Sequence, residues 1–408
     1  MRSNKFFRYL FFFSLLLLFY DSMYAYFLWN IKTDYITVFA FFSGILYHII
    51  YRQVGFNRKK YLVASLFFLV SMLYADSINS GILILRLLKT AVLYMVLTIT
   101  IDRKKELLKI ITTSCSVIMG VSIVAFFLGM IVNLPSFGSL SFNDGQYEFT
   151  NYLLYIKPYS VLDIYRFNSI FLEPGHVAMI AAYLLFANDF DFKHNKYLIP
   201  IFIAVVVSLS LAGYVLVVAG YLLSLFPKSK KRGRLQKLFY FALLLLSVYY
   251  LASVDNGGSN VLNDTIFSRL QYDTEKGIVG NNRTTAVADV YFEEAIKSGE
   301  IITGYGRKEY NEIVNSEEFF GGAGYKIYML KNGIIGTILV FMFYLFVAEA
   351  GPNKKKLRLM LLLYSFSFLQ RAYPEWWAWI LPFVCCGVEF SENPVYNPRK
   401  IYESSLYS

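Results

Sequence analysis

Long apolar runs separated by short polar segments dominate the hydrophobic pattern of this chain. A helix that crosses a bilayer needs about 20 mainly apolar residues, so we interpret each run as a membrane-spanning helix. The runs lie near residues 8–28, 35–51, 61–75, 81–100, 107–133, 167–187, 197–226, 235–253, 321–348, 356–372 and 376–390. No A-x-A site follows the first run, which favours an uncleaved span over a signal peptide.

The run 197–226 is too long for one upright helix, and its middle, 208–213, is suited to a tight turn. Lys193 and Lys196 precede it, and six basic residues follow it in the segment 228–237. Cytoplasmic loops are enriched in Lys and Arg, so both flanks lie on one side only if this run crosses twice. The pattern predicts an all-α polytopic membrane protein with about twelve transmembrane helices and both termini in the cytoplasm.

Two segments on the opposite, extracytoplasmic side are long, namely 134–166 and 254–320. In the second, acidic residues outnumber basic ones. Its stretch Ala286 to Lys297 has helical spacing, and Gly304-Tyr305-Gly306 predicts a turn. We expect a single membrane domain over 1–408, with 254–320 as a large extracytoplasmic loop between the ninth and tenth spans.

The composition supports a fold embedded in lipid. Hydrophobic residues make up 57% of the chain and charged residues 16%, against about 25% charged in a typical soluble domain. The net charge of +11 lies mainly in the segments between apolar runs. We therefore expect a lipid bilayer, and no nucleic acid, as a partner.

The densest group of ionisable residues stands at the start of the run 167–187, where Arg166, Glu173 and His176 lie within eleven residues. Pro174 suits a first helical turn, which places Glu173 beside the positive end of the helix dipole. Glu173 is the candidate general base, His176 is the alternative base, and Arg166 is a candidate for holding an anion. In the competing interpretation, Glu173 only caps the helix and hydrogen bonds satisfy His176.

Basic residues inside or near spans are functional candidates because a charge at the centre of a membrane helix costs about 2.5–3.5 kcal/mol. Arg86 and Lys89 share one face of the fourth span, and the alternative for Arg86 is pairing with an acid. Arg371 precedes Glu375 by four residues, so an ion pair between them competes with substrate contact.

Arg283 and Arg307 are further candidates in the segment 254–320, where the alternative is an ordinary solvated arginine. The chain has no G-x-x-x-x-G-K-[ST] phosphate loop and no H-E-x-x-H motif. Its three histidines cannot build a His-rich metal site, and we expect no metal or other cofactor.

Four stretches resemble the Wzy-type O-antigen and capsule repeat-unit polymerases. They are Arg166-Phe-Asn-Ser-Ile-Phe-Leu-Glu173-Pro174, Asn281-Asn282-Arg283, Gly304-Tyr305-Gly306 and Lys331-Asn332-Gly333-Ile334-Ile335-Gly336. The resemblance covers roughly 160–345. It implies a GT-C-like membrane glycosyltransferase fold in the bacterial cytoplasmic (inner) membrane. It also implies transfer of a growing glycan from undecaprenyl diphosphate to a sugar hydroxyl of another lipid-linked repeat unit.

Under this resemblance the partners are undecaprenyl-diphosphate-linked oligosaccharides and a protein that regulates chain length. The catalytic candidates are Glu173, His176, Arg166 and Arg283, and the substrate-binding candidates are Arg86, Arg307, Arg371 and Tyr305. An O-antigen ligase-like transferase, a lipid-linked oligosaccharide flippase or other transporter, and a non-catalytic scaffold are the alternatives. The related ligases usually carry a His shortly before the Gly-Ile-Ile-Gly-like turn, whereas this chain has Gly321-Gly322-Ala323-Gly324 there.

Overall fold

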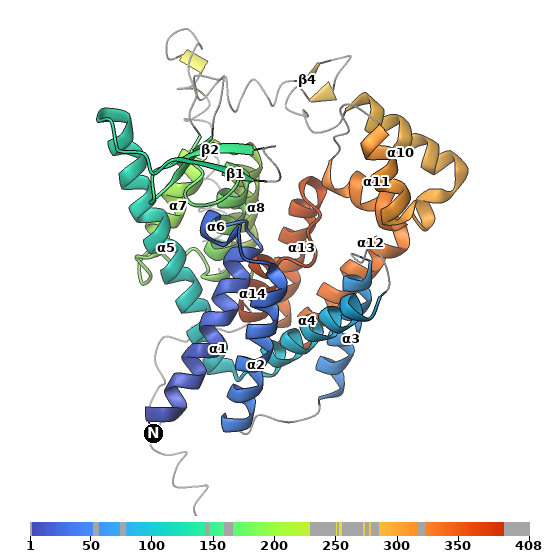
Figure 1. Cartoon of the computed structure of the whole chain (residues 1–408), viewed down its shortest axis with the longest axis horizontal. Helices are drawn as coiled ribbons and strands as arrows, with labels where there is room; N and C mark the ends of the chain where they lie inside the picture. The colour runs from blue at the N-terminus through green and yellow to red at the C-terminus, as the bar shows by residue number, and fades with distance from the viewer. Residues whose placement is uncertain are drawn as a thin grey trace, which may run out of the picture.

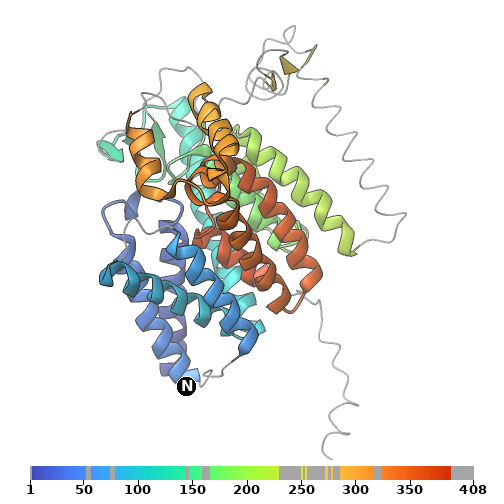
Figure 2. The ribbon, with the colours of Figure 1, turned by 90° about the vertical axis from the view of Figure 1, so that its right-hand side faces the viewer.

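The computed structural model is mostly helical, and Figures 1 and 2 show the helices packed side by side in one body. It describes residues 2–51, 57–73, 79–142, 147–158, 166–228, 250, 253–254, 272–273, 277–278, 285–316 and 323–386. The helices of the bundle are α1 (Arg2–Asp21), α2 (Thr33–Tyr51), α3 (Arg58–Met72), α4 (Ser80–Thr98), α5 (Ile101–Ile131), α6 (Pro174–Ala187), α7 (Leu198–Val207), α8 (Leu211–Lys228), α12 (Gly324–Ala350), α13 (Lys354–Gln370) and α14 (Trp377–Cys386). Each coincides with a predicted span or with half of the run 197–226. The predicted span 235–253 lies almost wholly outside the described residues.

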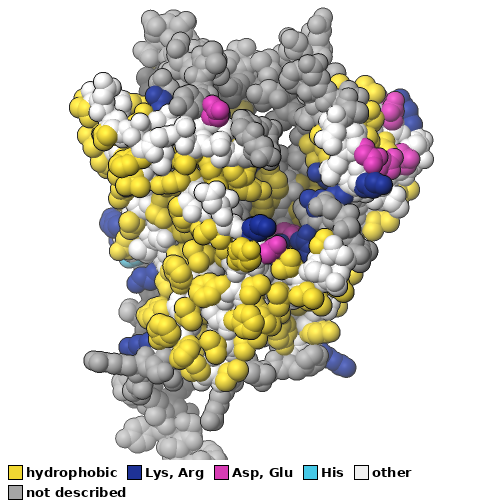
Figure 3. All heavy atoms as spheres, in the orientation of Figure 1, with side chains coloured by type: hydrophobic (Ala, Val, Ile, Leu, Met, Phe, Trp, Pro, Cys, Tyr) yellow, Lys and Arg dark blue, Asp and Glu magenta, His cyan; other side chains and the backbone are white. Residues whose placement is uncertain are grey.

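The exterior of the bundle is that of a membrane protein. Among the described helices, α2, α4, α5 and α12 are long and apolar enough to cross a membrane, and α6, α7, α8 and α14 are shorter apolar helices. On α5 the exposed apolar residues recur at helical spacing along one face, at Val117, Val121, Val124 and Leu128. A continuous exposed apolar surface needs a lipid or protein partner, and Figure 3 shows how much of one face is hydrophobic.

The predicted break in the run 197–226 is confirmed. Helix α7 ends at Val207 and α8 begins at Leu211, with Leu209 between them at a positive φ of 47°. Ten residues of α helix rise about 15 Å, half of a hydrocarbon core of about 30 Å. Two full crossings by this pair, and twelve crossings in total, remain predictions.

Helix α6 forms the centre of the bundle. Every residue from Gly175 to Ala187 is buried, and the helix packs against α7, α8, α13 and α14. A helix that is apolar on all sides is stable only where neighbours cover all sides. At its N-terminal end, His176 is therefore buried among other elements, whereas Glu173 is partly exposed.

The expectation of an all-α fold is wrong in two segments, 134–166 and 254–320, each of which contains a small antiparallel sheet. Residues of the predicted loop 134–166 form an antiparallel sheet in the order β1 (Ser139–Phe142), β2 (Tyr147–Asn151) and β3 (Ile156–Pro158). Phe149 and Ile156 pack with Leu172 just before α6, beside Trp29. Figure 1 shows the sheet at the end of the bundle opposite the N-terminus.

The described part of the segment 254–320 contains β4 (Tyr272–Asp273), β5 (Gly277–Ile278), α10 (Ala286–Ser298), the short 3₁₀ helix η5 (Glu300–Ile302) and α11 (Gly306–Ser316). The predicted helix and the predicted glycine turn are both confirmed. The Thr285 side chain caps α10 by accepting a hydrogen bond from Ala288 N, and Gly299 ends it at φ +84°. Ala295, Ile301 and Tyr310 of this unit pack on Leu330 of α12.

Two glycine motifs distant in sequence meet where this unit joins α12. Gly333 interrupts α12 with φ 67° and ψ −176°. Gly304 approaches so closely that a Cβ atom on it would lie 2.5 Å from Gly333 N. Tyr305 N donates a hydrogen bond to Leu330 O at 2.8 Å, so the turn occupies the interruption in the helix. Only glycine tolerates both the conformation and the close approach.

Candidate functional site

An ion pair at the start of α6 forms the first part of the site. Glu173 is the N-cap residue, but its side chain makes no capping hydrogen bond. Its carboxylate instead pairs with Arg371, which follows α13 and whose side chain is 7% exposed. Arg371 Nη1 also contacts His176 Nε2 at 2.7 Å. We call these three residues the Arg371 cluster; the interpretation of Glu173 as a simple helix cap is wrong.

This geometry defines the protonation of His176. A guanidinium group only donates hydrogen bonds, so His176 Nε2 accepts one and the ring is neutral with its proton on Nδ1. The lone pair of Nε2 is directed at Arg371 and is not free to take another proton. Glu173, whose side chain is 31% exposed, is therefore the better placed base of the two.

A second group of charges lies on the same connection between α13 and α14. Glu375 Oε2 accepts from Arg86 Nη1 at 2.9 Å and lies 3.9 Å from Lys89 Nζ, both on α4. Arg307 of α11 interacts electrostatically with Glu375 as well. We call these four residues the Glu375 cluster. The suggested ion pair of Arg371 with Glu375 is wrong, whereas the pairing of Arg86 with an acid is confirmed.

The two clusters together carry an excess of positive charge. Arg371, Arg86, Lys89 and Arg307 are four cations, and Glu173 and Glu375 are two carboxylates, so the two clusters have a formal net charge of +2, which Asp21 beside Lys89 offsets only in part. Figure 3 shows basic and acidic side chains gathered in the middle of a largely hydrophobic face. In surroundings of low dielectric constant, uncompensated positive charge attracts an anion strongly.

Unsatisfied polar atoms concentrate in the same stretch of chain. Within the described residues, four buried side-chain atoms that lack a hydrogen-bond partner belong to the short stretch 370–379. These four are Gln370 Oε1, Arg371 Nε, Glu375 Oε1 and Trp379 Nε1. Buried polar groups in folded proteins are nearly always paired, so such a concentration is typical of a site that binds a polar ligand.

Aromatic rings surround the Arg371 cluster. Trp376 packs edge-on against His176 with ring centroids 5.0 Å apart and stacks on Tyr373 at 4.0 Å. Tyr24 stacks on His176 with ring centroids 5.9 Å apart and packs edge-on against Trp376 at 5.8 Å. Burial raises the pKa of Tyr147 on β2, so this phenol stays protonated and can donate a hydrogen bond.

Not every predicted site residue joins these clusters. Arg166 Nε donates to Ser208 O at 3.3 Å, which places Arg166 at the break between α7 and α8. Tyr305 lies in the turn that occupies the break in α12. Arg283 lies outside the described residues. The expected grouping of Arg166 with Glu173 is therefore replaced by the pairing of Glu173 with Arg371.

Sequence reasoning missed the aromatic residues Tyr24 and Trp376 and treated Glu375 only as a neighbour of Arg371. The available signal was the run Tyr373-Pro374-Glu375-Trp376-Trp377 between two spans, which is rich in residues of the membrane interface. In the part of the chain that the structure describes, no group of three or more His, Cys, Asp or Glu residues is arranged to hold a metal ion.

Comparison with known proteins adds no family. No protein-family model, curated protein or solved structure matches this chain.

Proposed function

We propose that this chain is a membrane polysaccharide polymerase of the Wzy type. It transfers a glycan from undecaprenyl diphosphate to a sugar hydroxyl of another lipid-linked repeat unit. The observation that carries the proposal is the connection 371–376. It contributes Arg371 and Glu375, the residues at the centre of the two charged clusters, and two of the buried polar atoms that lack a hydrogen-bond partner. A net charge of +2 suits a diphosphate leaving group, and Arg pairs phosphate oxygens through two parallel hydrogen bonds.

In the proposed reaction, a bond forms between the acceptor oxygen and the anomeric carbon of the donor while the bond from that carbon to the diphosphate oxygen breaks. Glu173 accepts the proton of the acceptor hydroxyl. Arg371, with Arg86 and Arg307, stabilises the negative charge that builds up on the diphosphate. Arg371 takes the role that the sequence alone suggested for Arg166, because Arg371 and not Arg166 pairs with Glu173.

The proposal includes an orientation in the bacterial inner membrane. The N-terminus and the basic segments face the cytoplasm, and about twelve helices cross the bilayer. The sheet β1–β3 and the unit α10–α11 then cover the outer face, where newly transported lipid-linked repeats arrive. Both lie at the end of the bundle away from the N-terminus (Figure 1).

The test is deletion of the gene in its native host, followed by gel analysis of the surface glycan. Complementation uses the wild type, Arg371→Lys and the control Arg358→Lys, since the Arg358 side chain is 60% exposed. We expect the deletion to leave a single repeat unit, the wild type and control to restore the ladder, and Arg371→Lys to fail. Long glycan that stays on its lipid carrier would show a ligase instead, and absence of any outer repeat would show a transporter.

A further inference from the structure

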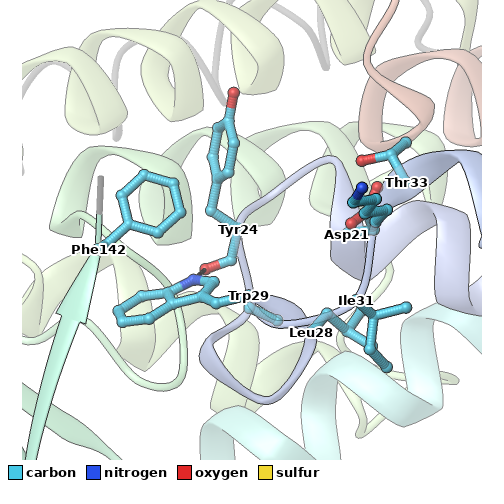
Figure 4. A pocket seen from close by; sticks show the side chains of 9 residues that line it. Asp21, Tyr24, Leu28, Trp29, Ile31, Thr33 and Phe142 are labelled. Atoms are coloured by element: carbon cyan, nitrogen blue, oxygen red, sulfur yellow. Dashed lines mark hydrogen bonds between the residues drawn. The ribbon is translucent and has the colours of Figure 1, made fainter. Parts of the chain in front are cut away.

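A pocket of about 260 Å³ opens between the end of α1, the start of α2 and the sheet. Figure 4 shows Trp29 and Phe142 on one side, Tyr24 above them, and Asp21 and Thr33 on the other side. Small-molecule sites usually measure about 300–1,000 Å³, so this pocket has room for a compact ligand only. Its walls differ in chemistry, and this difference indicates what the ligand is.

One wall is aromatic. The rings of Trp29 and Phe142 lie 4.9 Å apart between centroids, and Tyr24 packs edge-on against Phe142 at 5.4 Å. The opposite wall is polar, because it holds the Asp21 carboxylate and the Thr33 hydroxyl. Rings of this kind favour a flat apolar partner, and a carboxylate favours hydroxyl donors. A pyranose has both features, with an apolar C–H face and a rim of hydroxyl groups.

The pocket is formed before any ligand binds. Trp29 Nε1 donates to Tyr24 O at 2.8 Å, and Tyr24 N donates to Asp21 O at 2.9 Å. Tyr24 adopts a positive φ of 54°, a conformation that non-glycine residues keep only when their surroundings hold it. A preformed site loses little conformational entropy on binding, which favours affinity for a small ligand.

The pocket also adjoins both charged clusters. Tyr24 lines the pocket and stacks on His176 of the Arg371 cluster at 5.9 Å. Asp21 lines the pocket and interacts electrostatically with Lys89 of the Glu375 cluster. A ligand in the pocket is therefore adjacent to the residues proposed to bind the diphosphate and to accept the proton.

We propose that this pocket binds one neutral pyranose ring, which stacks on Trp29 and Phe142 and directs hydroxyl groups towards Asp21. Binding of the ring stands on the pocket itself. Its role as the acceptor sugar, the ring whose hydroxyl attacks the donor, rests on the proposed polymerase function. The pocket then contributes to selection of the acceptor, because only a ring that fits it presents a hydroxyl to Glu173.

The experiment is saturation-transfer NMR on the full-length protein in nanodiscs prepared without glycoside detergents, which would compete for the pocket. The probes are the methyl pyranosides of glucose, galactose, mannose, N-acetylglucosamine, N-acetylgalactosamine, rhamnose and fucose. The variants are Trp29→Ala, Trp29→Phe and the control Phe137→Ala, whose ring is 61% exposed and does not line the pocket.

We expect at least one pyranoside to bind with a dissociation constant on the order of millimolar, as ligands of this size do. Trp29→Ala should weaken that binding about tenfold or more, while Trp29→Phe, which keeps a ring, and Phe137→Ala stay within about threefold of the wild type. No transfer to any probe, or equal transfer in wild type and Trp29→Ala, overturns the proposal. If Trp29→Ala does not fold, a folded Trp29→Phe variant that loses pyranoside binding overturns the proposal, because a phenyl ring should still stack on the sugar.

This outcome is independent of the gel experiment. Pyranoside binding that depends on Trp29, in a protein whose deletion leaves polymer length unchanged, keeps the pocket as a sugar site and removes the polymerase function. Loss of the ladder on deletion, without pyranoside binding, supports the polymerase function and removes the pocket as a sugar site.

Discussion

Substitution Arg371→Met tests the charged network most directly. It leaves the Glu173 carboxylate and His176 Nε2 without the guanidinium that both contact. The Arg371 side chain is only 7% exposed, and removing one partner of a buried ion pair costs about 3–5 kcal/mol of stability. At about 2–4 °C per kcal/mol, we expect the apparent Tm to fall by about 6–20 °C.

The three cysteines provide the assay. Cys115, Cys385 and Cys386 form no disulfide and are buried, so a thiol-reactive fluorophore labels them only as the protein unfolds. The control is Arg358→Met, which removes an arginine from the exposed ion pair with Glu349 and should leave the Tm nearly unchanged.

The double variant Arg371→Met with Glu173→Gln distinguishes pairing from simple loss of side-chain volume. It removes both charges together, so part of the lost stability should return, with a coupling free energy of about 0.5–3 kcal/mol. If Arg371→Met lowers the Tm no more than Arg358→Met does, or if the double variant is as unstable as the single one, Arg371 and Glu173 do not form the buried pair described above.

Two further predictions use the same assay. Gly333→Ala should destabilise the protein by about 3 kcal/mol or more, because a Cβ there meets the Ile302 carbonyl. Gly299→Ala should cost only about 1 kcal/mol, because Gly299 has a positive φ but no atom within 4 Å of its Cβ. Similar Tm values for the two variants would contradict the close approach at Gly333. Lys356 donates to Ala187 O at 2.9 Å and pairs with Asp189 at 3.0 Å. Its replacement by Met should lower the free energy of unfolding by about 3–5 kcal/mol, and a much smaller loss would show that the pair is solvated.

The positions of the helices followed from sequence alone. Runs of apolar residues of the right length marked each helix of the bundle, and the residues 208–213 marked the break between α7 and α8. Local composition suffices there, because a backbone in an apolar environment must satisfy its own hydrogen bonds within each segment. Helix α10 was also predictable, since its apolar spacing and the glycine after it are local signals.

The sheet β1–β3 was not predictable in this way. Its strands contain only three to five residues, and polar and apolar residues alternate too briefly to distinguish a strand from a loop. What holds the sheet is its contact with Trp29 and Leu172, which come from other parts of the chain.

Which charges meet was decided only by the tertiary structure. A spacing of four residues pairs side chains on a helix, but α13 ends at Gln370 and α14 begins at Trp377, so Arg371 and Glu375 lie in a non-helical connection and point to different partners. Arg371 meets an acid 198 residues earlier, and Glu375 meets an arginine 289 residues earlier. The sequence by itself determined that buried charges exist within an apolar chain. The packing of α4 and α6 around residues 371–376 decided how they combine, because a buried charge pairs with whichever opposite charge the neighbouring helices bring within reach.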